Sequence, residues 1–251
     1  MATQLRRNTD RSEAEWTARQ ELAACYRIFD MLGWSESIYN HITVRVPGEE
    51  AFLINPFGLL WSEVTASNLV KIDSEGNKLC GSPYPINKAG FTQHACFHRH
   101  IDWAHAIVHT HTPDTMAVCS SGEGLTPTNF YGCFFEGQVG YHDFDGITVR
   151  AEEGERLIRN AGNKQVLMRR NHGPVVMAPT LPAMCLSYYM LQRACEIQVK
   201  TAALGKPVTV PPEVVEVHQR DRDKMLVADF GKLDFEAWKR KIDAIDSGWR
   251  E

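Results

Sequence analysis

Apolar residues recur at helical spacing in several long segments of the chain. One such pattern runs from about Ser12 to Leu32, where glycine follows and ends it. A second covers 87–99, and a third covers 181–204, with Thr180 as the expected N-cap and Gly205 after the last turn. These patterns predict three helices, and another is expected after Pro113.

Short apolar runs bounded by turn residues predict strands between these helices. The expected strands are 39–46, 51–56, 66–73, a run from Ala106 to the histidines that follow it, and two strands within 164–178 joined by the turn "RNHG". Residues 146–162 predict a strand followed by a helix. This mixture predicts a single α/β domain over 1–251 with a central, mostly antiparallel sheet. Residues 206–251 are charged and helical in pattern, which suggests an arm or a lid.

Composition narrows the function classes. The chain has 251 residues and a net charge of −4, with its basic residues in short pairs or triplets, so a nucleic-acid-binding face is not expected. Its first residues are polar and no window is long and apolar enough for a membrane span. Seven scattered cysteines without a CxxC pair predict reduced thiols and a cytoplasmic protein.

The most specific chemical signal is a pair of histidines at the end of an apolar strand. His109 and His111 are two residues apart, so on a strand both rings point to one face. Such a pair can be two satisfied polar groups at a strand end, or half of a metal site. His172, in the turn "RRNHGPVV", adds a third imidazole, and three imidazoles with one open position are a common catalytic metal arrangement. His94 and His98 can both be further ligands or one face of a helix.

Several motifs in order carry a resemblance to a known family. They are "YNHITVRV", "INKAGF", "VHTHTP", "YHDFDGI", "RNHG" and "ACEIQV". Together they resemble the class II aldolase/adducin family over about 15–205, with adducin head domains and their bacterial relatives as the nearest branch. The resemblance implies a three-layer α/β/α sandwich, a homotetramer with active sites between subunits, and a divalent metal on His109, His111 and His172. Zinc is the expected metal, with Fe²⁺, Mn²⁺ and Co²⁺ open.

The chain departs from the sugar-phosphate aldolases of that family at their substrate-binding positions. Their acid/base glutamate corresponds to Gly90, and the two serines before it correspond to Lys88 and Ala89. Phe57 stands where a small hydroxyl residue is found, and the family's "GN" appears as Asn40–His41. We therefore expect Asn40, Lys88, Gly90 and Phe57 at a pocket for a small non-phosphorylated substrate, with Lys88 available to a carboxylate.

These expectations favour a metal-dependent lyase that cleaves by retro-aldol reaction or decarboxylation through a stabilised enolate. Tyr131, Glu136 and His94 are the expected proton carriers, with Lys88 as a further candidate. Aromatic residues either line the pocket or fill the core; they are Phe57, Phe91, Phe130, Tyr131, Phe134 and Phe135.

Two other functions stay open. The fold also contains iron-dependent oxygenases, and imidazole ligands suit Fe²⁺ as well as zinc. An adducin-like assembly module without catalysis is supported by the missing glutamate. Adducin heads do not keep all three of these histidines. Their complete set in this chain therefore favours the enzyme. The expected partner is a small-molecule substrate. Binding to nucleic acid or to a membrane is not expected.

Overall fold

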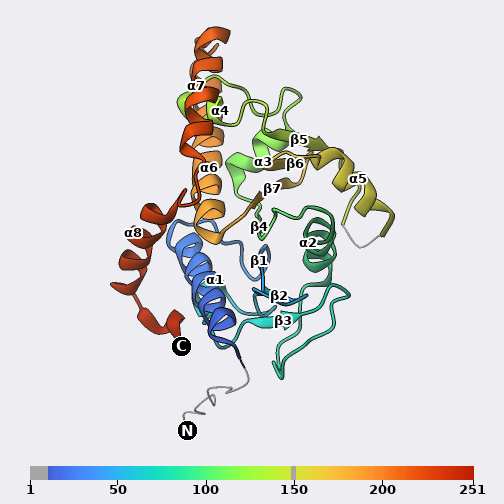
Figure 1. The fold of residues 1–251 in the computed structure, drawn as a ribbon. Helices are drawn as coiled ribbons and strands as arrows, with labels where there is room; N and C mark the ends of the chain where they lie inside the picture. The colour runs from blue at the N-terminus through green and yellow to red at the C-terminus, as the bar shows by residue number, and fades with distance from the viewer. Residues whose placement is uncertain (1–10, 148–150) are drawn as a thin grey trace.

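A computed structural model describes residues 11–147 and 151–251 of the protein (Figure 1). Its elements are α1 Glu13–Met31, β1 His41–Arg45, β2 Phe52–Ile54, the 3-10 turn η1 Trp61–Glu63, β3 Val70–Ile72, α2 Lys88–His100, β4 Ala106–His109, α3 Pro113–Ser120, α4 Phe130–Phe134, β5 Val139–His142, α5 Ala151–Ala161, β6 Val166–Arg169, β7 Gly173–Ala178, α6 Leu181–Leu204, α7 Pro212–Met225, α8 Lys232–Asp243 and η2 Ser247–Arg250. The expected long helices form where the sequence places them. Ser12 caps α1 through Glu15 N–H, and Thr180 caps α6 through Ala183 N–H.

The strands form one seven-stranded sheet in the order β3-β2-β1-β4-β7-β6-β5. Every neighbouring pair is antiparallel except β5 and β6, which are parallel. The predicted α/β class with a mostly antiparallel sheet is therefore confirmed. β4 and β7 lie in the middle, and all their residues are buried.

Alternating strand residues pack against helices on opposite faces of the sheet. Val108 and Val176 belong to the core shared with α1 and α6, whereas Ile107 and Met177 belong to the core shared with α2 and α5. Helices thus cover both faces, as Figure 1 shows, and the expected three-layer α/β/α arrangement is confirmed.

Two local features differ from the sequence prediction. β5 is not predicted, because glycine and polar residues interrupt its apolar pattern. Of the strand expected over 146–150, Gly146 and Ile147 lie in a bend, and 148–150 fall outside the described residues.

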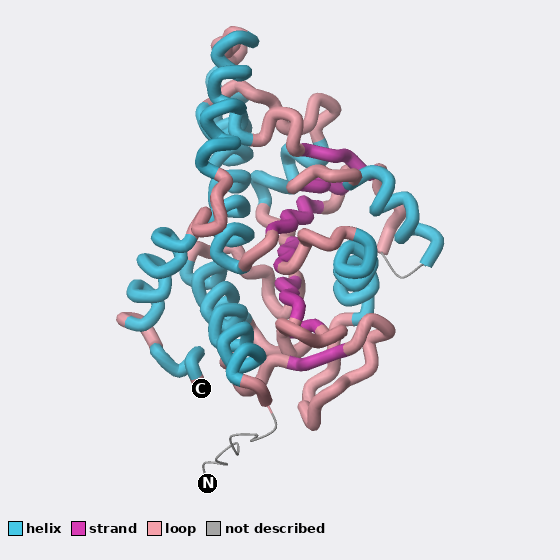
Figure 2. Tube along the Cα trace, in the orientation of Figure 1, coloured by secondary structure: helices cyan, strands magenta, loops and turns pink. Residues whose placement is uncertain are grey.

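The C-terminal segment packs on the outside of the helical layer and does not form a lid over the site described below. α7 contacts α4, and α8 contacts α1 and α6 (Figure 2). The buried Arg222 of α7 donates to the Phe134 carbonyl oxygen at 3.0 Å, which fixes α7 to α4. The description of 206–251 as a helical arm of a single domain stays a prediction.

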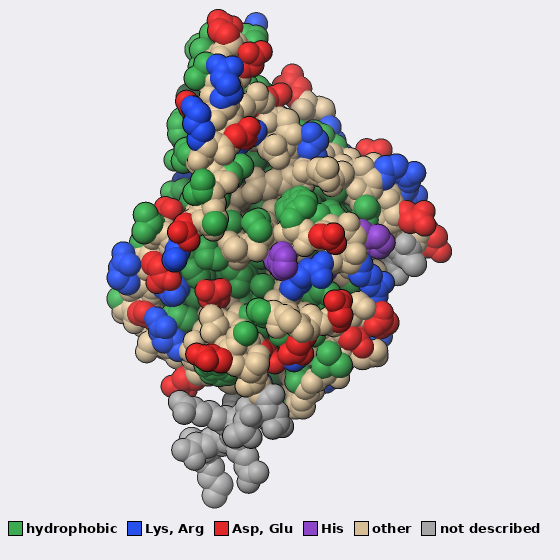
Figure 3. All heavy atoms as spheres, viewed as in Figure 1, with side chains coloured by type: hydrophobic (Ala, Val, Ile, Leu, Met, Phe, Trp, Pro, Cys, Tyr) green, Lys and Arg blue, Asp and Glu red, His purple; other side chains and the backbone are tan. Residues whose placement is uncertain are grey.

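Side chains of both charges are interspersed on the face drawn in Figure 3. This mixture fits the small net charge of −4. Within the described residues, no helix is both long and apolar enough to cross a bilayer.

Candidate metal centre

Two of the three expected metal-binding histidines come from the end of β4. His109 is the last residue of this strand and pairs with His41 of β1, and His111 lies two residues farther along. The His109 and His111 Nε2 atoms are 3.0 Å apart. Both rings therefore reach the same point at the C-terminal end of β4.

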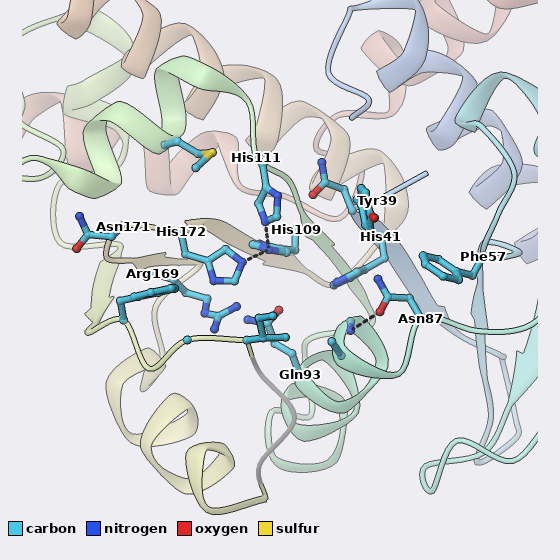
Figure 4. Close-up of a pocket in the computed structure, with 17 residues that line it drawn as sticks. Tyr39, His41, Phe57, Asn87, Gln93, His109, His111, Arg169, Asn171 and His172 are labelled. Atoms are coloured by element: carbon cyan, nitrogen blue, oxygen red, sulfur yellow. Dashed lines mark hydrogen bonds between the residues drawn. The ribbon is translucent and has the colours of Figure 1, made fainter. Parts of the chain in front are cut away.

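The third histidine comes from the tight turn between β6 and β7. His172 Nε2 lies 3.3 Å from His109 Nε2 (Figure 4). Asn171 before it has a positive φ of 55°, a conformation that Asn adopts more readily than most residues. A Cβ atom on Gly173 would lie 2.4 Å from the Thr110 carbonyl oxygen, so only glycine lets this hairpin close on the end of β4.

Hydrogen bonds on the far side of two rings decide which nitrogen carries the proton. His109 Nδ1 donates to the Pro174 carbonyl oxygen at 2.9 Å, and His111 Nδ1 donates to Glu36 Oε2 at 2.8 Å. Their Nε2 atoms therefore face each other as lone pairs, which repel unless a cation lies between them.

The spacing of the nitrogen atoms also suits a metal. A tetrahedral ion with nitrogen ligands at about 2.0–2.1 Å holds them about 3.3 Å apart, close to the separations of 3.0 and 3.3 Å found for His109 with His111 and His172. The Glu36 carboxylate behind His111 is the outer-shell partner that metal-binding histidines commonly have. The residues present thus fit a divalent metal on His109, His111 and His172 with one position left for a substrate.

Burial keeps these rings neutral, the form that binds a metal. It lowers the pKa of His109 well below its usual value and the pKa of His172 to about 3. Burial also lowers the pKa of His111, although the Glu36 carboxylate opposes that shift.

The histidines line a cavity of about 450 Å³. Its walls include the apolar or aromatic side chains of Tyr39, Phe57, Met116, Phe144 and Ile147. Of the residues expected at the substrate, Asn40, Phe57 and Gly90 line it. Such a cavity, with apolar residues in its walls and a few converging polar groups, is typical of a small-molecule site.

Lys88 does not line this cavity, which corrects the expectation for it. At the start of α2, Ala89, Gly90 and Gln93 face the cavity, whereas Lys88 lies on the opposite side of the helix and is exposed. In this structure Lys88 is therefore not part of the cavity wall.

Tyr131 and Glu136 also lie away from the cavity. Tyr131 is in α4, which packs on α6 and α7, and Glu136 follows α4 and is exposed. Most of the expected pocket aromatics likewise lie elsewhere: Phe91, Phe134 and Phe135 are core residues, and Phe130 is exposed. The aromatic residues at the cavity are Phe57, Tyr39 and Phe144.

His94 and His98 are neither metal ligands with the three histidines nor cavity residues. Both are buried beneath β1, where the Thr43 hydroxyl lies 2.8 Å from a ring nitrogen of each. His94 is therefore not in direct reach of a substrate in this cavity. His41 stands between His94 and the cavity and lines it.

The sequence analysis missed Glu36 and His41. Glu36 lies in the loop before β1 and belongs to no recognisable motif, so only the folded chain brings it to His111. His41 belongs to the quoted motif "YNHITVRV", but the sequence does not reveal that its ring turns toward Gly90.

A second group of potential ligands lies nearby but resembles an ion-pair network. His142, Asp145 and Glu153 have ligand atoms close enough together for an ion. Arg169 Nη2, however, lies 3.2 Å from Glu153 Oε1, so a guanidinium supplies the positive charge there. The three histidines are therefore the better candidate for a metal.

Comparison with known proteins agrees with this geometry. The family described as Class II Aldolase and Adducin N-terminal domain matches residues 20–199. The chain belongs to the class II aldolase and adducin family. A "Putative aldolase class 2 protein" of Caulobacter vibrioides is 40% identical over 96% of this chain and 94% of its own length.

Other family relatives include adducins and solved structures. Alpha-adducin of Rattus norvegicus is 44% identical over 200 residues, which are 78% of this chain and 27% of that protein. The crystal structure of an aldolase II superfamily protein from Pseudomonas syringae has a TM-score of 0.93 at 34% identity, over 96% of this chain and 98% of that one. An L-fuculose 1-phosphate aldolase from Glaciozyma antarctica has a TM-score of 0.84 at 24% identity over 95% of this chain and 93% of that one, which shows the shared fold.

The Glu36 carboxylate gives a testable prediction. We expect Glu36→Gln to weaken metal binding about 10- to 100-fold, because the neutral amide lacks the negative charge with which the carboxylate supports the His111 ring. Competition with a chelator of known affinity measures the change. The exposed Glu50→Gln is the matched control. Equal metal affinity of Glu36→Gln and wild type would show that this carboxylate does not support a metal ligand.

Proposed function

We propose that this protein is a divalent-metal-dependent lyase that acts on a small non-phosphorylated hydroxy or carboxylate substrate. The observation that carries the proposal is the convergence of three neutral imidazoles in a cavity whose walls include apolar and aromatic side chains. When bound, a divalent metal supplies Lewis-acid stabilisation of an enolate, which serves both retro-aldol cleavage and decarboxylation. Zinc is the metal we expect, although imidazole ligands also accept Fe²⁺, Mn²⁺ or Co²⁺.

The remaining lining residues support a substrate with at most one carboxylate. Ala89 and Gly90 bring the N-terminal end of α2 to the cavity, where helix dipole and backbone N–H groups favour a negative group. Among the described lining residues, Arg169 is the one cationic side chain, and it is paired with Glu153. Apart from the metal and this helix end, a phosphate dianion would therefore meet only a paired guanidinium among the described lining residues.

The apolar wall suits the body of such a substrate. The Tyr39 and Phe57 ring centroids are 6.3 Å apart, and the Phe144 ring centroid lies 6.0 Å from that of His172. An aromatic or aliphatic body between these rings would leave its oxygen atoms toward the histidines.

A substrate panel tests the proposal. We expect the metal-loaded protein to release carbon dioxide from dihydroxybenzoates or to cleave small hydroxy acids at least about 100-fold faster than chelated protein. L-fuculose 1-phosphate should not be cleaved at a useful rate. Rapid cleavage of this sugar phosphate would overturn the non-phosphorylated substrate, and turnover that consumes dioxygen would favour the oxygenase.

The identity of 44% with alpha-adducin supports a second candidate, an assembly module without catalysis. Metal binding separates the two. A folded protein that binds no divalent metal would favour the assembly module over the lyase.

A further inference from the structure

His41 occupies the space left open by Gly90. A Cβ atom on Gly90 would lie 2.1 Å from His41 Cδ2 and 2.3 Å from His41 Nε2. The imidazole and any side chain at position 90 therefore exclude each other. The resemblance to the sugar-phosphate aldolases implies a carboxylate at position 90. In this protein the His41 ring of β1 fills that space instead.

A chain of hydrogen bonds runs from this ring into the protein. His41 Nδ1 lies 3.0 Å from His94 Nε2, and His94 Nδ1 lies 2.8 Å from the Thr43 hydroxyl. The same hydroxyl lies 2.8 Å from His98 Nε2, and His98 Nδ1 lies 2.8 Å from the carbonyl oxygen of Ala104.

The carbonyl at the inner end sets the direction of every bond in the chain. A carbonyl can only accept, so His98 carries its proton on Nδ1, and its Nε2 accepts from Thr43. The Thr43 oxygen then accepts from His94 Nδ1, and His94 Nε2 accepts from His41 Nδ1. His41 consequently carries its proton on the inner nitrogen.

The rings in this chain are neutral, as the argument requires. His41, His94 and His98 are 4%, 0% and 1% exposed. Burial lowers the pKa of His94 well below its usual value and that of His98 to about 3. Each ring therefore has one donor and one acceptor nitrogen.

The outer nitrogen of His41 is left as a lone pair at the cavity. His41 lines the cavity, and among residues 11–147 and 151–251 no hydrogen bond to its Nε2 is present. Its ring centroid lies 5.4 Å from that of His109. A ligand that contacts the three histidines therefore also lies near His41 Nε2.

We propose that His41 Nε2 takes the place of the missing carboxylate as the acceptor for a substrate hydroxyl group, and that the chain through His94, Thr43 and His98 holds it in this tautomer. The inference rests on the proposed function and makes its substrate more specific. The substrate carries a free hydroxyl next to the oxygen atoms that face His109, His111 and His172. A methyl ether at that hydroxyl leaves the His41 lone pair without a donor and binds more weakly.

Nitrogen NMR of the metal-free protein tests the tautomer without any substrate or activity. In ¹⁵N-histidine-labelled protein we expect His41, His94 and His98 each to carry the proton on Nδ1. Thr43→Val removes the hydroxyl link but keeps the side-chain shape, so His94 loses its acceptor and we expect His41 to shift toward the form protonated on Nε2. Thr43→Ser, the matched control, should retain the wild-type pattern. Wild-type His41 protonated on Nε2 would overturn the inference.

Ligand discrimination tests what the tautomer does. We expect catechol to bind the zinc-loaded wild type at least about tenfold more tightly than guaiacol, its methyl ether. The preference should fall to about twofold in Thr43→Val and remain about tenfold in Thr43→Ser. Any effect of the methyl group on binding to the metal is the same in wild type and both variants, so a difference between them reports on His41. An equal preference in Thr43→Val and wild type would reject the role of His41 even if lyase activity is found. The expected tautomers and preference without lyase activity would leave His41 as a binding group and reject only the reaction.

Discussion

His109→Ala will remove most of the bound metal from a protein that remains folded. His109 Nε2 is 3.0 Å from His111 Nε2 and 3.3 Å from His172 Nε2, so its ring is the centre of the donor set. With two ligands left, we expect metal affinity to fall by at least about 100-fold. Loss of the hydrogen bond to Pro174 and of the buried ring should cost about 1–3 kcal/mol of unfolding free energy.

Chelator competition and circular dichroism measure these two effects separately. His105→Ala is the matched control, because His105 directly precedes β4 but is exposed and only its backbone oxygen bonds to β1. It should bind metal like wild type. Wild-type metal content in His109→Ala would contradict a site built on this residue.

Gly173→Ala is expected to damage the site without removing any ligand. The new methyl group would lie 2.4 Å from the Thr110 carbonyl oxygen and 3.2 Å from His111 Cδ2. The hairpin that carries His172 must therefore move away from the end of β4. We expect a loss of about 1–3 kcal/mol in unfolding free energy and a fall in metal affinity of at least about tenfold.

Urea unfolding and metal titration check this prediction. Gly81→Ala is the control, because a Cβ atom there would meet nothing within 4 Å. If Gly173→Ala kept wild-type metal affinity, the close approach of the hairpin would not be what positions His172.

Local sequence signals were sufficient for the three histidines. An apolar strand with two histidines at its end, and a third in a turn between two strands, are patterns that the sheet carries directly into space. Because β4, β7 and β6 are neighbours, the end of β4 and the β6–β7 turn meet at the same end of these strands. The N-terminal ends of α1 and α6 were predictable for a similar reason, since Ser12 and Thr180 cap them through hydrogen bonds within the first turn.

The surroundings of the histidines depend on tertiary packing and were not predictable in this way. Tyr131 and Glu136 were expected at the cavity from the resemblance alone, but in this chain α4 packs on α6 and α7. Glu36 reaches His111 from a loop that is 75 residues away in sequence. The fit of His41 against Gly90 joins a strand to a helix, and neither residue indicates the other in the sequence.

The departure at Gly90 acquires a physical meaning from this packing. Read alone, glycine at the position of an acid/base carboxylate suggests lost catalysis. In the fold, it is the residue that gives His41 room beside His109 of the candidate metal site. Gly90 and the His41 ring are thus one coupled feature of the site.

X-ray absorption spectroscopy of the protein, purified without a histidine tag and loaded with zinc, tests the central claim most directly. The account predicts about one zinc per chain, with three imidazole nitrogen ligands at about 2.0–2.1 Å and one oxygen ligand, from water or substrate, completing a tetrahedron. Zinc that is absent from folded protein, or bound through sulfur or mainly through carboxylates, would contradict a metal centre on His109, His111 and His172.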